Sequence, residues 1–425
     1  MAAGGSTRTD RPGTNGHAAA PTPPGDAPVR QASLREHNLG LVLRHVGAAP
    51  RPPSRADISA ATGLTRATVS ALVDDLIGGR LLTEVDPAPR TGAGRPAAGL
   101  VLAANGPAGL GLEINVDYLA ACVVDLAGTV RHRIVHRADQ RPNTPAEVLT
   151  GLARLAAAAR SAAGAQALTL AGAALAVPGL VTDAGLVRLA PNLGWRDVDV
   201  PGILGDHPAL SGTPLTVDNE ANLAALGELH AAPPGPANFL YISGEIGIGA
   251  GIVLHGKLFR GARGWSGELG HVPVHPDGPA CRCGSRGCLE QYAGQEAILS
   301  AAGLAGHGLS PDAAVAGLAE LADAGDAAAT AALTSAGTAL GVAVAGVVNL
   351  LDVDTVVLGG VYAPLAPWLR PAVEAQLRQR VLTAAWSPVR VRPSVLGGDA
   401  AVVGAAGSVV RAVRDHPARW LTVLA

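Results

Sequence analysis

The 425-residue chain has few of the features that mark several other protein classes. It contains four cysteines, too few for the disulfide framework of a small secreted protein. No stretch approaches about 18 apolar residues without glycine, proline or charge, so we expect no membrane span. The N-terminus lacks a charged segment followed by an apolar one, which predicts no secretory signal. These absences predict a cytoplasmic protein with reduced thiols.

Lysine is almost missing, since Lys257 stands beside 31 arginines. Alanine, glycine and proline are abundant at the same time, so this bias indicates codon composition rather than function. The net charge of −2 excludes a uniformly basic nucleic-acid coat. The charge is nevertheless uneven, because residues 1–100 carry eleven arginines against eight acids, or +3, and the remainder carries −5. A DNA-binding surface is therefore expected only near the N-terminus.

Composition divides the chain into successive parts. Residues 1–32 are rich in proline, glycine, alanine and threonine and predict a disordered arm. Residues 33–104 predict three helices followed by two short strands. Residues 105–218 and 219–396 alternate strands and helices and predict two α/β lobes, each opening with a strand meander. We expect the C-terminal helix, residues 397–425, to pack back on the first lobe.

Residues 33–104 have the pattern of a helix-turn-helix unit. A helix is predicted from Ser54 to Ala61, a turn at Thr62–Leu64 and a further helix from Thr65 to Ile77. Short hydroxyl groups and one cation that can reach base edges or phosphates stand at the front of the last helix: Thr65, Arg66, Thr68 and Ser70. The pattern therefore favours DNA binding.

A wing is predicted after these helices. The loop between strands predicted at 81–85 and 99–102 carries Arg90 and Arg95, which can enter a narrow minor groove. The alternative is a three-helix bundle with a hairpin that serves protein contacts. We prefer the DNA-binding interpretation.

Three of the four cysteines lie within eight residues, at Cys281, Cys283 and Cys288, and His271 lies ten residues upstream. Three cysteines and one histidine complete a closed tetrahedral Zn²⁺ site of the structural type, with no position for a catalytic water. A disulfide is a poor alternative because the Cys-x-Cys spacing strains the bridge. Unrelated thiols are the other alternative. Cys122 lies in an apolar predicted strand and is expected in the core.

Polar residues gather around the cysteine segment. Asp218–Asn222 lies at a predicted strand-to-helix junction, Gly244–Gly251 is a glycine-rich turn between two strands, and Glu268 and Glu290 flank the cysteines. Each feature alone is typical of a surface acid, a helix cap or a hairpin. Together they favour a ligand rich in hydroxyl groups, because carboxylates and amides bind sugars through paired hydrogen bonds.

The segments Gly267–His271 and Cys281–Glu290 resemble the ROK family, which groups bacterial sugar kinases with winged-helix regulators of sugar genes. Pro191–Trp195 and Leu358–Gly360 add to a resemblance that covers residues 33–410. It implies a winged helix-turn-helix followed by a two-lobed α/β, actin-like (ribonuclease H-like) domain with a ligand cleft. It also implies contacts to sugar hydroxyls from Asn192, Asn219, Glu220, Glu268, His271 and Glu290, with His271 joining sugar to zinc.

The chain departs from the kinase pattern at three places. Glu113–Asp117 replaces Asp-x-Gly-Gly-Thr, in which bare glycines let the backbone approach ATP phosphates. Ile246 replaces a threonine of the second phosphate loop. Glu220 replaces the aspartate base, and its longer side chain misplaces a group that must reach its proton. These departures predict that the protein is not an enzyme.

The sequence therefore predicts a sugar-responsive transcriptional repressor that binds double-stranded operator DNA and a small sugar. A homodimer or tetramer is expected, because two heads must match two half-sites. Two alternatives stay open at this point. One is an active ATP-dependent sugar kinase fused to a DNA-binding head, and the other is a ligand-independent DNA-binding protein whose zinc domain only dimerises.

Overall fold

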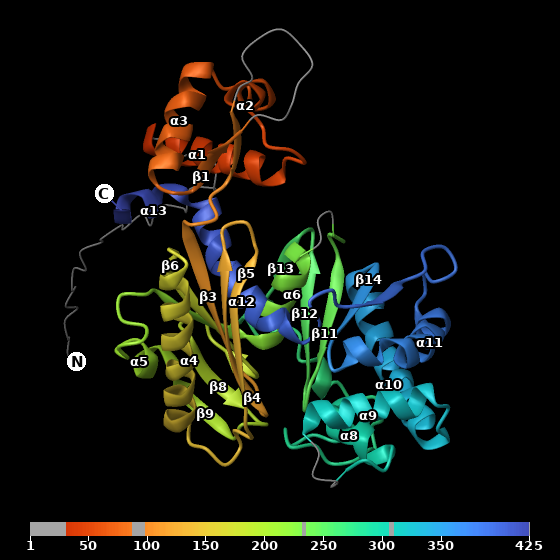
Figure 1. The fold of residues 1–425 in the computed structure, drawn as a ribbon. Helices are drawn as coiled ribbons and strands as arrows, with labels where there is room; N and C mark the ends of the chain where they lie inside the picture. The colour runs from red at the N-terminus through yellow and green to blue at the C-terminus, as the bar shows by residue number, and fades with distance from the viewer. Residues whose placement is uncertain (1–30, 87–97, 232–234, 306–309, 425) are drawn as a thin grey trace, which may run out of the picture.

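The computed structural model describes residues 31–86, 98–231, 235–305 and 310–424. Figure 1 shows a small helical head above two α/β lobes, with helix α12 running from between the lobes towards the head. The predicted disordered arm lies almost entirely outside the described residues, and so do Arg90 and Arg95 of the predicted wing.

The head consists of α1 (Gln31–Ala48), α2 (Arg55–Thr62), α3 (Arg66–Gly78) and the antiparallel strands β1 (Leu82–Val85) and β2 (Gly99–Leu102). These elements follow the predicted ones closely, although α1 begins at Gln31, two residues before the expected Ser33. Leucine, isoleucine and valine side chains from all three helices and both strands fill the core of the head.

Local capping explains where α2 and α3 begin and end. The Ser54 side chain accepts a hydrogen bond from the Asp57 N–H, and the Asp57 carboxylate accepts one from the Ser54 N–H. Gly63 ends α2 with a φ of 73°, a conformation that costs glycine nothing. The Thr65 hydroxyl then accepts from the Thr68 N–H and starts α3. The predicted helix-turn-helix geometry is thus encoded locally.

The first lobe is built on a five-stranded sheet of order β10-β6-β3-β4-β5. Its strands are β3 (Pro107–Ile114), β4 (Tyr118–Asp125), β5 (Val130–Arg137), β6 (Thr169–Val177) and β10 (Leu215–Asn219). The first three form an antiparallel meander, and β6 and β10 add to it in parallel. Helix α4 (Pro145–Ala165) packs against β3 and β4. A small sheet of β7 (Leu180–Val181), β8 (Leu186–Ala190) and β9 (Trp195–Asp199), followed by α5 (Val200–Leu204), completes the lobe.

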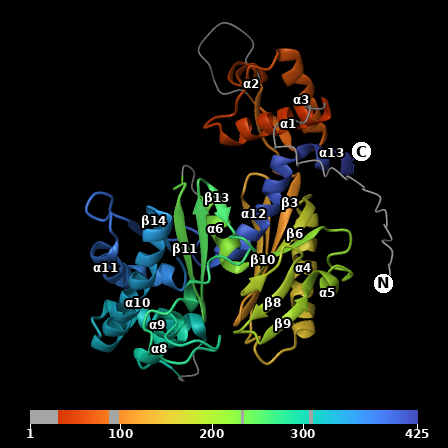
Figure 2. The ribbon, with the colours of Figure 1, turned by 180° about the vertical axis from the view of Figure 1, so that it is seen from behind.

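The second lobe repeats this plan in the order β13-β12-β11-β14-β15. Its strands are β11 (Phe239–Gly244), β12 (Ile248–Leu254), β13 (Lys257–Phe259), β14 (Thr355–Gly360) and β15 (Arg390–Pro393). Its helices are α6 (Glu220–Ala231), α7 (Glu290–Ala293), α8 (Gln295–Ala301), α9 (Pro311–Asp323), α10 (Ala327–Leu351) and α11 (Tyr362–Arg380). Figure 2, from behind, shows α4 and α5 on the outer side of the first lobe, and α10 and α11 on the outer side of the second. The repeated sheet confirms the predicted two-lobed, actin-like architecture.

Helix α10 is the one helix of the described ranges that is long and apolar enough to cross a membrane. In its most hydrophobic window, 56% is buried inside the molecule. It packs closely against α11, and its apolar face belongs to the core of the second lobe.

The C-terminal segment forms two helices, α12 (Ala400–Asp415) and α13 (Pro417–Leu424), after the 3-10 turn η2 (Gly397–Asp399). The expectation of one helix over residues 397–425 was therefore wrong. The physical reason is Pro417, which cannot donate the hydrogen bond that a continuing helix needs and which restricts the residue before it. His416 adopts non-helical angles at this break.

Glycines allow α12 to pack closely on both of its neighbours. A Cβ atom at Gly111 of β3 would lie 2.1 Å from the Val402 carbonyl oxygen of α12. A Cβ atom at Gly404 of α12 would lie 1.9 Å from the Leu223 carbonyl oxygen of α6. Because real side chains do not approach backbone this closely, only glycine permits this helix position.

The same helix joins the head to the lobes through α13. The Trp420 indole N–H donates to the carbonyl oxygen of Gly79, at the end of α3, at 2.9 Å. Trp420 is buried in a core shared by the head, by β4 and by α12. The head is therefore fixed to the first lobe by apolar packing as well as by the chain connection.

Replacement of Gly404 by alanine should lower the free energy of unfolding by about 1–3 kcal/mol, because the new methyl group displaces α12 from α6. Gly407, on the same helix, has open space around its Cβ position and is the matched control. Its change to alanine should raise stability by up to about 1 kcal/mol. Urea unfolding of both variants measures the difference, and equal effects would contradict the proposed packing constraint.

Candidate functional site

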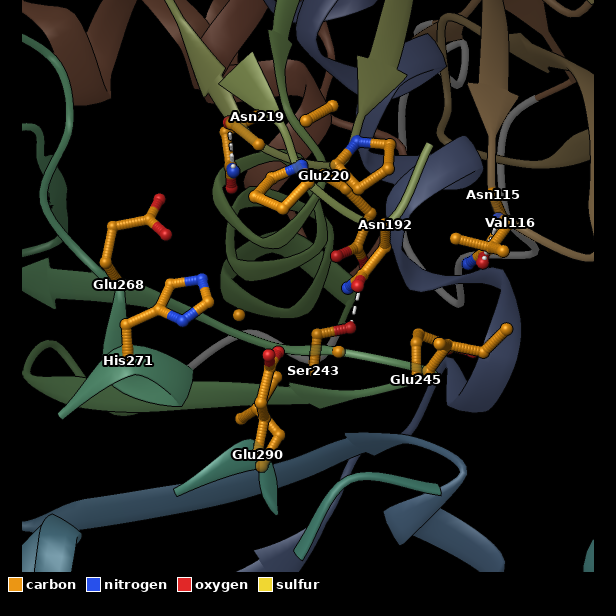
Figure 3. A pocket seen from close by; sticks show the side chains of 18 residues that line it. Asn115, Val116, Asn192, Asn219, Glu220, Ser243, Glu245, Glu268, His271 and Glu290 are labelled. Atoms are coloured by element: carbon orange, nitrogen blue, oxygen red, sulfur yellow. Dashed lines mark hydrogen bonds between the residues drawn. The ribbon is translucent and has the colours of Figure 1, made fainter. Parts of the chain in front are cut away.

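A polar pocket lies between the lobes and contains all six residues for which sugar contacts are predicted. It encloses about 660 Å³, including the part open to solvent. In Figure 3, Glu268 and His271 lie on the left and Asn115, Val116 and Glu245 on the right, with Asn192, Asn219 and Glu220 in the middle and Glu290 below them. The structure thus brings together side chains from positions 115 to 290.

The junction of β10 and α6 fixes the amide of Asn219. Its Oδ1 accepts from the Asn222 N–H at 3.2 Å and so caps α6, while its Nδ2 donates to the Gly179 carbonyl oxygen at 2.9 Å. Asp218, beside it, accepts two hydrogen bonds from the Arg260 guanidinium at 3.0 and 2.5 Å. Asn219 is therefore held in one orientation towards the pocket.

Glu220 is the first residue of α6, and only 9% of it is exposed. The Ser243 hydroxyl donates to its Oε1 at 2.8 Å, as the dashed line in Figure 3 shows. Burial raises the pKa of Glu220 to about 7, although the hydrogen bond from Ser243 opposes this rise. Sequence reasoning missed Ser243, because its only signal was its position at the end of an apolar strand.

The cysteine cluster forms the wall next to His271. Within the described residues, the ligand atoms of His271, Cys281, Cys283 and Cys288 lie within 4.8 Å of one another. The Sγ atoms of Cys283 and Cys288 are 3.7 Å apart, and His271 Nδ1 lies 3.8 Å from the Cys281 Sγ. A tetrahedron with Zn–S bonds of about 2.3 Å has edges of about 3.8 Å, so these donors suit a tetrahedral metal ion. Since its Nδ1 faces the cysteines, His271 joins the cluster to the pocket it lines.

A second cavity, of about 940 Å³ including its open part, lies beside the first and shares Glu245 with it. Glu113, which is 1% exposed, lines this cavity and accepts a hydrogen bond from the Tyr118 hydroxyl at 2.6 Å. Its other carboxyl oxygen has no partner among the described residues. Burial, and next the charge of Glu220, raise the pKa of Glu113 to about 8. Sequence reasoning did not foresee this cavity, which forms only when the lobes pack together.

Residues of the segment Glu113–Asp117, which departs from the kinase pattern, line both cavities. Asn115 and Val116 line the first pocket, where the Val116 N–H donates to Asn115 Oδ1 at 2.6 Å. Ile246, the second departure, lines the same pocket. Asp117 lines neither cavity, and burial raises its pKa.

Arginines of the first lobe pair with acids across the cleft. Arg137, at the end of β5, forms an ion pair with Asp312 of α9. Arg141, in the loop after β5, forms one with Glu296 of α8 at 3.0 Å. Although exposed ion pairs contribute little stability singly, these two pairs link the lobes at two points.

Four of the six predicted DNA-contacting residues lie at the front of α3, and the other two, Arg90 and Arg95, lie outside the described residues. Thr65 and Arg66 are exposed, and Thr68 and Ser70 are partly buried. The hydroxyls of Thr65 and Thr68 lie 2.8 Å apart at the helix cap. Farther along α3, Asp74 is paired with Arg55 and Asp75 with Arg35.

Comparison with known proteins now decides the family. The model of the ROK family matches residues 109–411, and that of the IclR helix-turn-helix domain matches residues 39–86. The chain belongs to the ROK family. The resemblance inferred from the cysteine segment, and the order of a helix-turn-helix head followed by a ROK domain, are thereby confirmed.

Individual ROK relatives match over different lengths. The xylose repressor of Bacillus subtilis is 30% identical over 392 residues, which is 91% of this chain and 97% of that protein. A crystal structure of a ROK family transcriptional regulator, a homologue of the E. coli MLC protein, is 26% identical, covers 92% of this chain and all of its own, and has a TM-score of 0.74. A ROK family glucokinase from Streptomyces griseus, solved with glucose and AMPPNP, is 28% identical, covers 71% and 98%, and has a TM-score of 0.61.

The contribution of Glu220 to stability should fall as pH rises from about 4.5 to about 7. Glu220 has a raised pKa, so the folded protein retains this proton above pH 4.5, where the unfolded chain loses it. Glu220→Gln, which still accepts from Ser243, should flatten the pH dependence. Urea unfolding at several pH values measures it, with Glu320→Gln on the exposed side of α9 as the control. A Glu220→Gln profile as steep as that of the original protein would contradict this assignment.

Proposed function

We propose that the protein is a cytoplasmic, sugar-responsive transcriptional repressor that binds double-stranded operator DNA. The single observation that carries this proposal is the combination, in one chain, of a helix-turn-helix head and a polar interlobe pocket joined by α12 and α13. The relatives named xylose repressor span nearly the whole chain, head included. A homodimer or tetramer would place two heads on two half-sites.

The head meets DNA through the front of α3 in this proposal. Arg66 is exposed at the N-terminus of that helix, where unpaired backbone N–H groups also favour a phosphate. Thr65, Thr68 and Ser70 supply short hydroxyl groups beside it. Arg90 and Arg95 extend the contact as a wing.

The pocket holds the sugar in this proposal. Glu220 and Glu268 offer acceptors from the second lobe, and Asn192 and Asn219, which precede it in the chain, add amides that both donate and accept. His271 and Glu290 complete the set on the side of the cysteine cluster. Such paired acceptors and donors suit a ligand whose every carbon carries a hydroxyl group.

Zn²⁺ is the ion we assign to the His271, Cys281, Cys283 and Cys288 cluster, because three thiolates and one imidazole are its preferred structural ligands. When bound, the ion would order the segment that precedes Glu290. It would also hold the His271 ring with its Nε2 free to meet a sugar hydroxyl.

In this proposal, α12 transmits the effect of sugar binding from the pocket to the head. Val402, in its first turn, lines the second cavity, between the lobes. Its C-terminal end carries α13, whose Trp420 bonds to the end of α3. A sugar that favours one lobe arrangement would therefore shift the head, by a coupling typical of about 1–3 kcal/mol.

The rival function is an ATP-dependent sugar kinase with a DNA-binding head. Glucokinases are among the proteins that resemble the ROK part of the chain, and this similarity is the reason to consider a kinase. Against it stands the segment Glu113–Asp117, which replaces the glycine-rich phosphate segment of the kinases and places the Asn115 and Val116 side chains in the first pocket. Glu220, in place of aspartate, is a further departure on the catalytic side. We infer that the pocket binds sugar without phosphorylating it.

Operator binding measured by fluorescence anisotropy, with a sugar panel headed by D-xylose and D-glucose, tests the function. At least one sugar should weaken operator affinity by fivefold or more, and the same preparation should show no ATP-dependent phosphorylation in a coupled assay. Phosphorylation of a sugar would support the kinase instead. An operator affinity that no sugar alters would support the ligand-independent alternative.

Arg66→Ala should weaken operator binding by about 1–3 kcal/mol and reduce the slope of log affinity against log salt by about one. The control is Arg419→Ala on α13, at the other end of α3 roughly 20 Å away. Operator affinity measured at several salt concentrations for both variants separates the effect of Arg66 from that of Arg419. Equal losses in the two variants would contradict the placement of α3 on DNA.

Cys283→Ser should remove the metal and the sugar response together, because a serine hydroxyl does not replace a thiolate ligand. Metal content by mass spectrometry and sugar-dependent operator binding measure the two losses. Cys122→Ala, in the core of β4, should retain both. A sugar response that survives without metal would refute the proposed link.

A further inference from the structure

A third cavity continues the sugar pocket outward. It shares Asn192, Ile246 and Glu290 with that pocket and encloses about 830 Å³, including its open part. It does not contain Glu220 or Asn219, so it extends from the end of the pocket that Glu290 marks. The cleft thus has an inner chamber, which is the sugar pocket, and an outer chamber, which is this cavity.

Gly247 keeps the passage between the chambers open. A Cβ atom there would lie 2.6 Å from Asn192 Nδ2 and 3.3 Å from Glu290 Oε2. These two polar side chains, one from each lobe, therefore converge on the point where the chambers meet. An amide and a carboxylate at such a junction can bind oxygen atoms of a ligand that occupies both chambers.

The outer chamber is lined by groups that bind hydroxyls. Arg282 and Gln291 supply donors, and Glu296 supplies acceptors. Glu296 is held from both sides, by Arg282 at 3.4 Å and by Arg141 of the first lobe at 3.0 Å. The outer chamber, like the inner one, is therefore formed by both lobes in the arrangement that this structure shows.

Charge distinguishes between possible occupants of the outer chamber. Arg282, the arginine of its lining, is already paired with Glu296, and Glu290 adds a further acid. A phosphate group would have to compete with Glu296 for Arg282 and would lie near the acid Glu290, whereas a neutral polyhydroxyl ring would do neither. The side chains of Arg282 and Glu296 are 54% and 51% exposed, which leaves space for a longer substituent to reach solvent.

We propose that the outer chamber is a second sugar subsite, so that the effector is a neutral disaccharide or glycoside with one ring in each chamber. The proposal rests on the proposed function, because it requires sugar in the inner chamber. It adds that Arg282, Gln291 and Glu296 determine specificity for the second ring.

Calorimetric titration of the full-length protein with D-xylose, xylobiose, D-glucose and cellobiose tests this subsite. At least one disaccharide should bind ten times more tightly than its monosaccharide. Arg282→Ala and Gln291→Ala should each remove most of this difference and leave monosaccharide affinity unchanged. Arg286→Ala, on the same loop but outside the chamber, is the matched control and should retain the difference. Melting temperatures verify that each variant is folded.

Two other results separate this proposal from the proposed function. If a monosaccharide binds and alters operator affinity but no disaccharide binds more tightly, the subsite is refuted and the sugar-responsive repressor stands. If none of the four sugars binds and operator affinity is insensitive to them, both proposals fail. A disaccharide advantage that persists in Arg282→Ala and Gln291→Ala would place the second ring elsewhere and overturn the subsite.

Discussion

The close packing of α12 is the constraint on which the rest of the molecule depends. Glycines on β3 and on α12 itself remove every side chain that would separate this helix from the first sheet and from α6. Because packed cores respond in discrete arrangements, a helix held this way moves with its neighbours as a unit. Its two ends lie at the interlobe cavity and at the DNA-binding head, so the same contacts that stabilise the fold connect the two regions.

The sugar pocket has one rigid side and one side where a buried carboxyl group can gain or lose a proton near neutral pH. The cysteine cluster offers the rigid one, since four ligand atoms lie at tetrahedral spacing and His271 belongs to both cluster and pocket. Glu220 belongs to the other, because burial raises its pKa to about 7. A ligand rich in hydroxyl groups forms hydrogen bonds with such an acid without adding charge, whereas a polyphosphate would bring charge into a pocket whose lining, among the described residues, contains no arginine or lysine. This difference favours sugar binding over nucleotide binding.

Features set by neighbouring residues could be predicted from the sequence. The caps at Ser54, Gly63 and Thr65 act within four residues, and the spacing of the cysteines indicated their cluster directly. The six residues assigned to sugar contacts do meet in one pocket, although it was resemblance rather than spacing that selected them. By contrast, the outer chamber and the Arg141–Glu296 pair join residues about 50 to 150 positions apart, and no local pattern encodes them. The break between α12 and α13 is also local, because Pro417 itself ends the hydrogen-bond pattern of α12.

The central claim is that α12 and α13 carry the effect of sugar to the head. Its most direct test is operator affinity with and without a bound sugar in Trp420→Ala, which removes the indole contact to Gly79 and leaves the pocket and α3 intact. The account predicts that the variant binds sugar with unchanged affinity and that sugar no longer alters its operator affinity. An operator response as large as that of the original protein would contradict it.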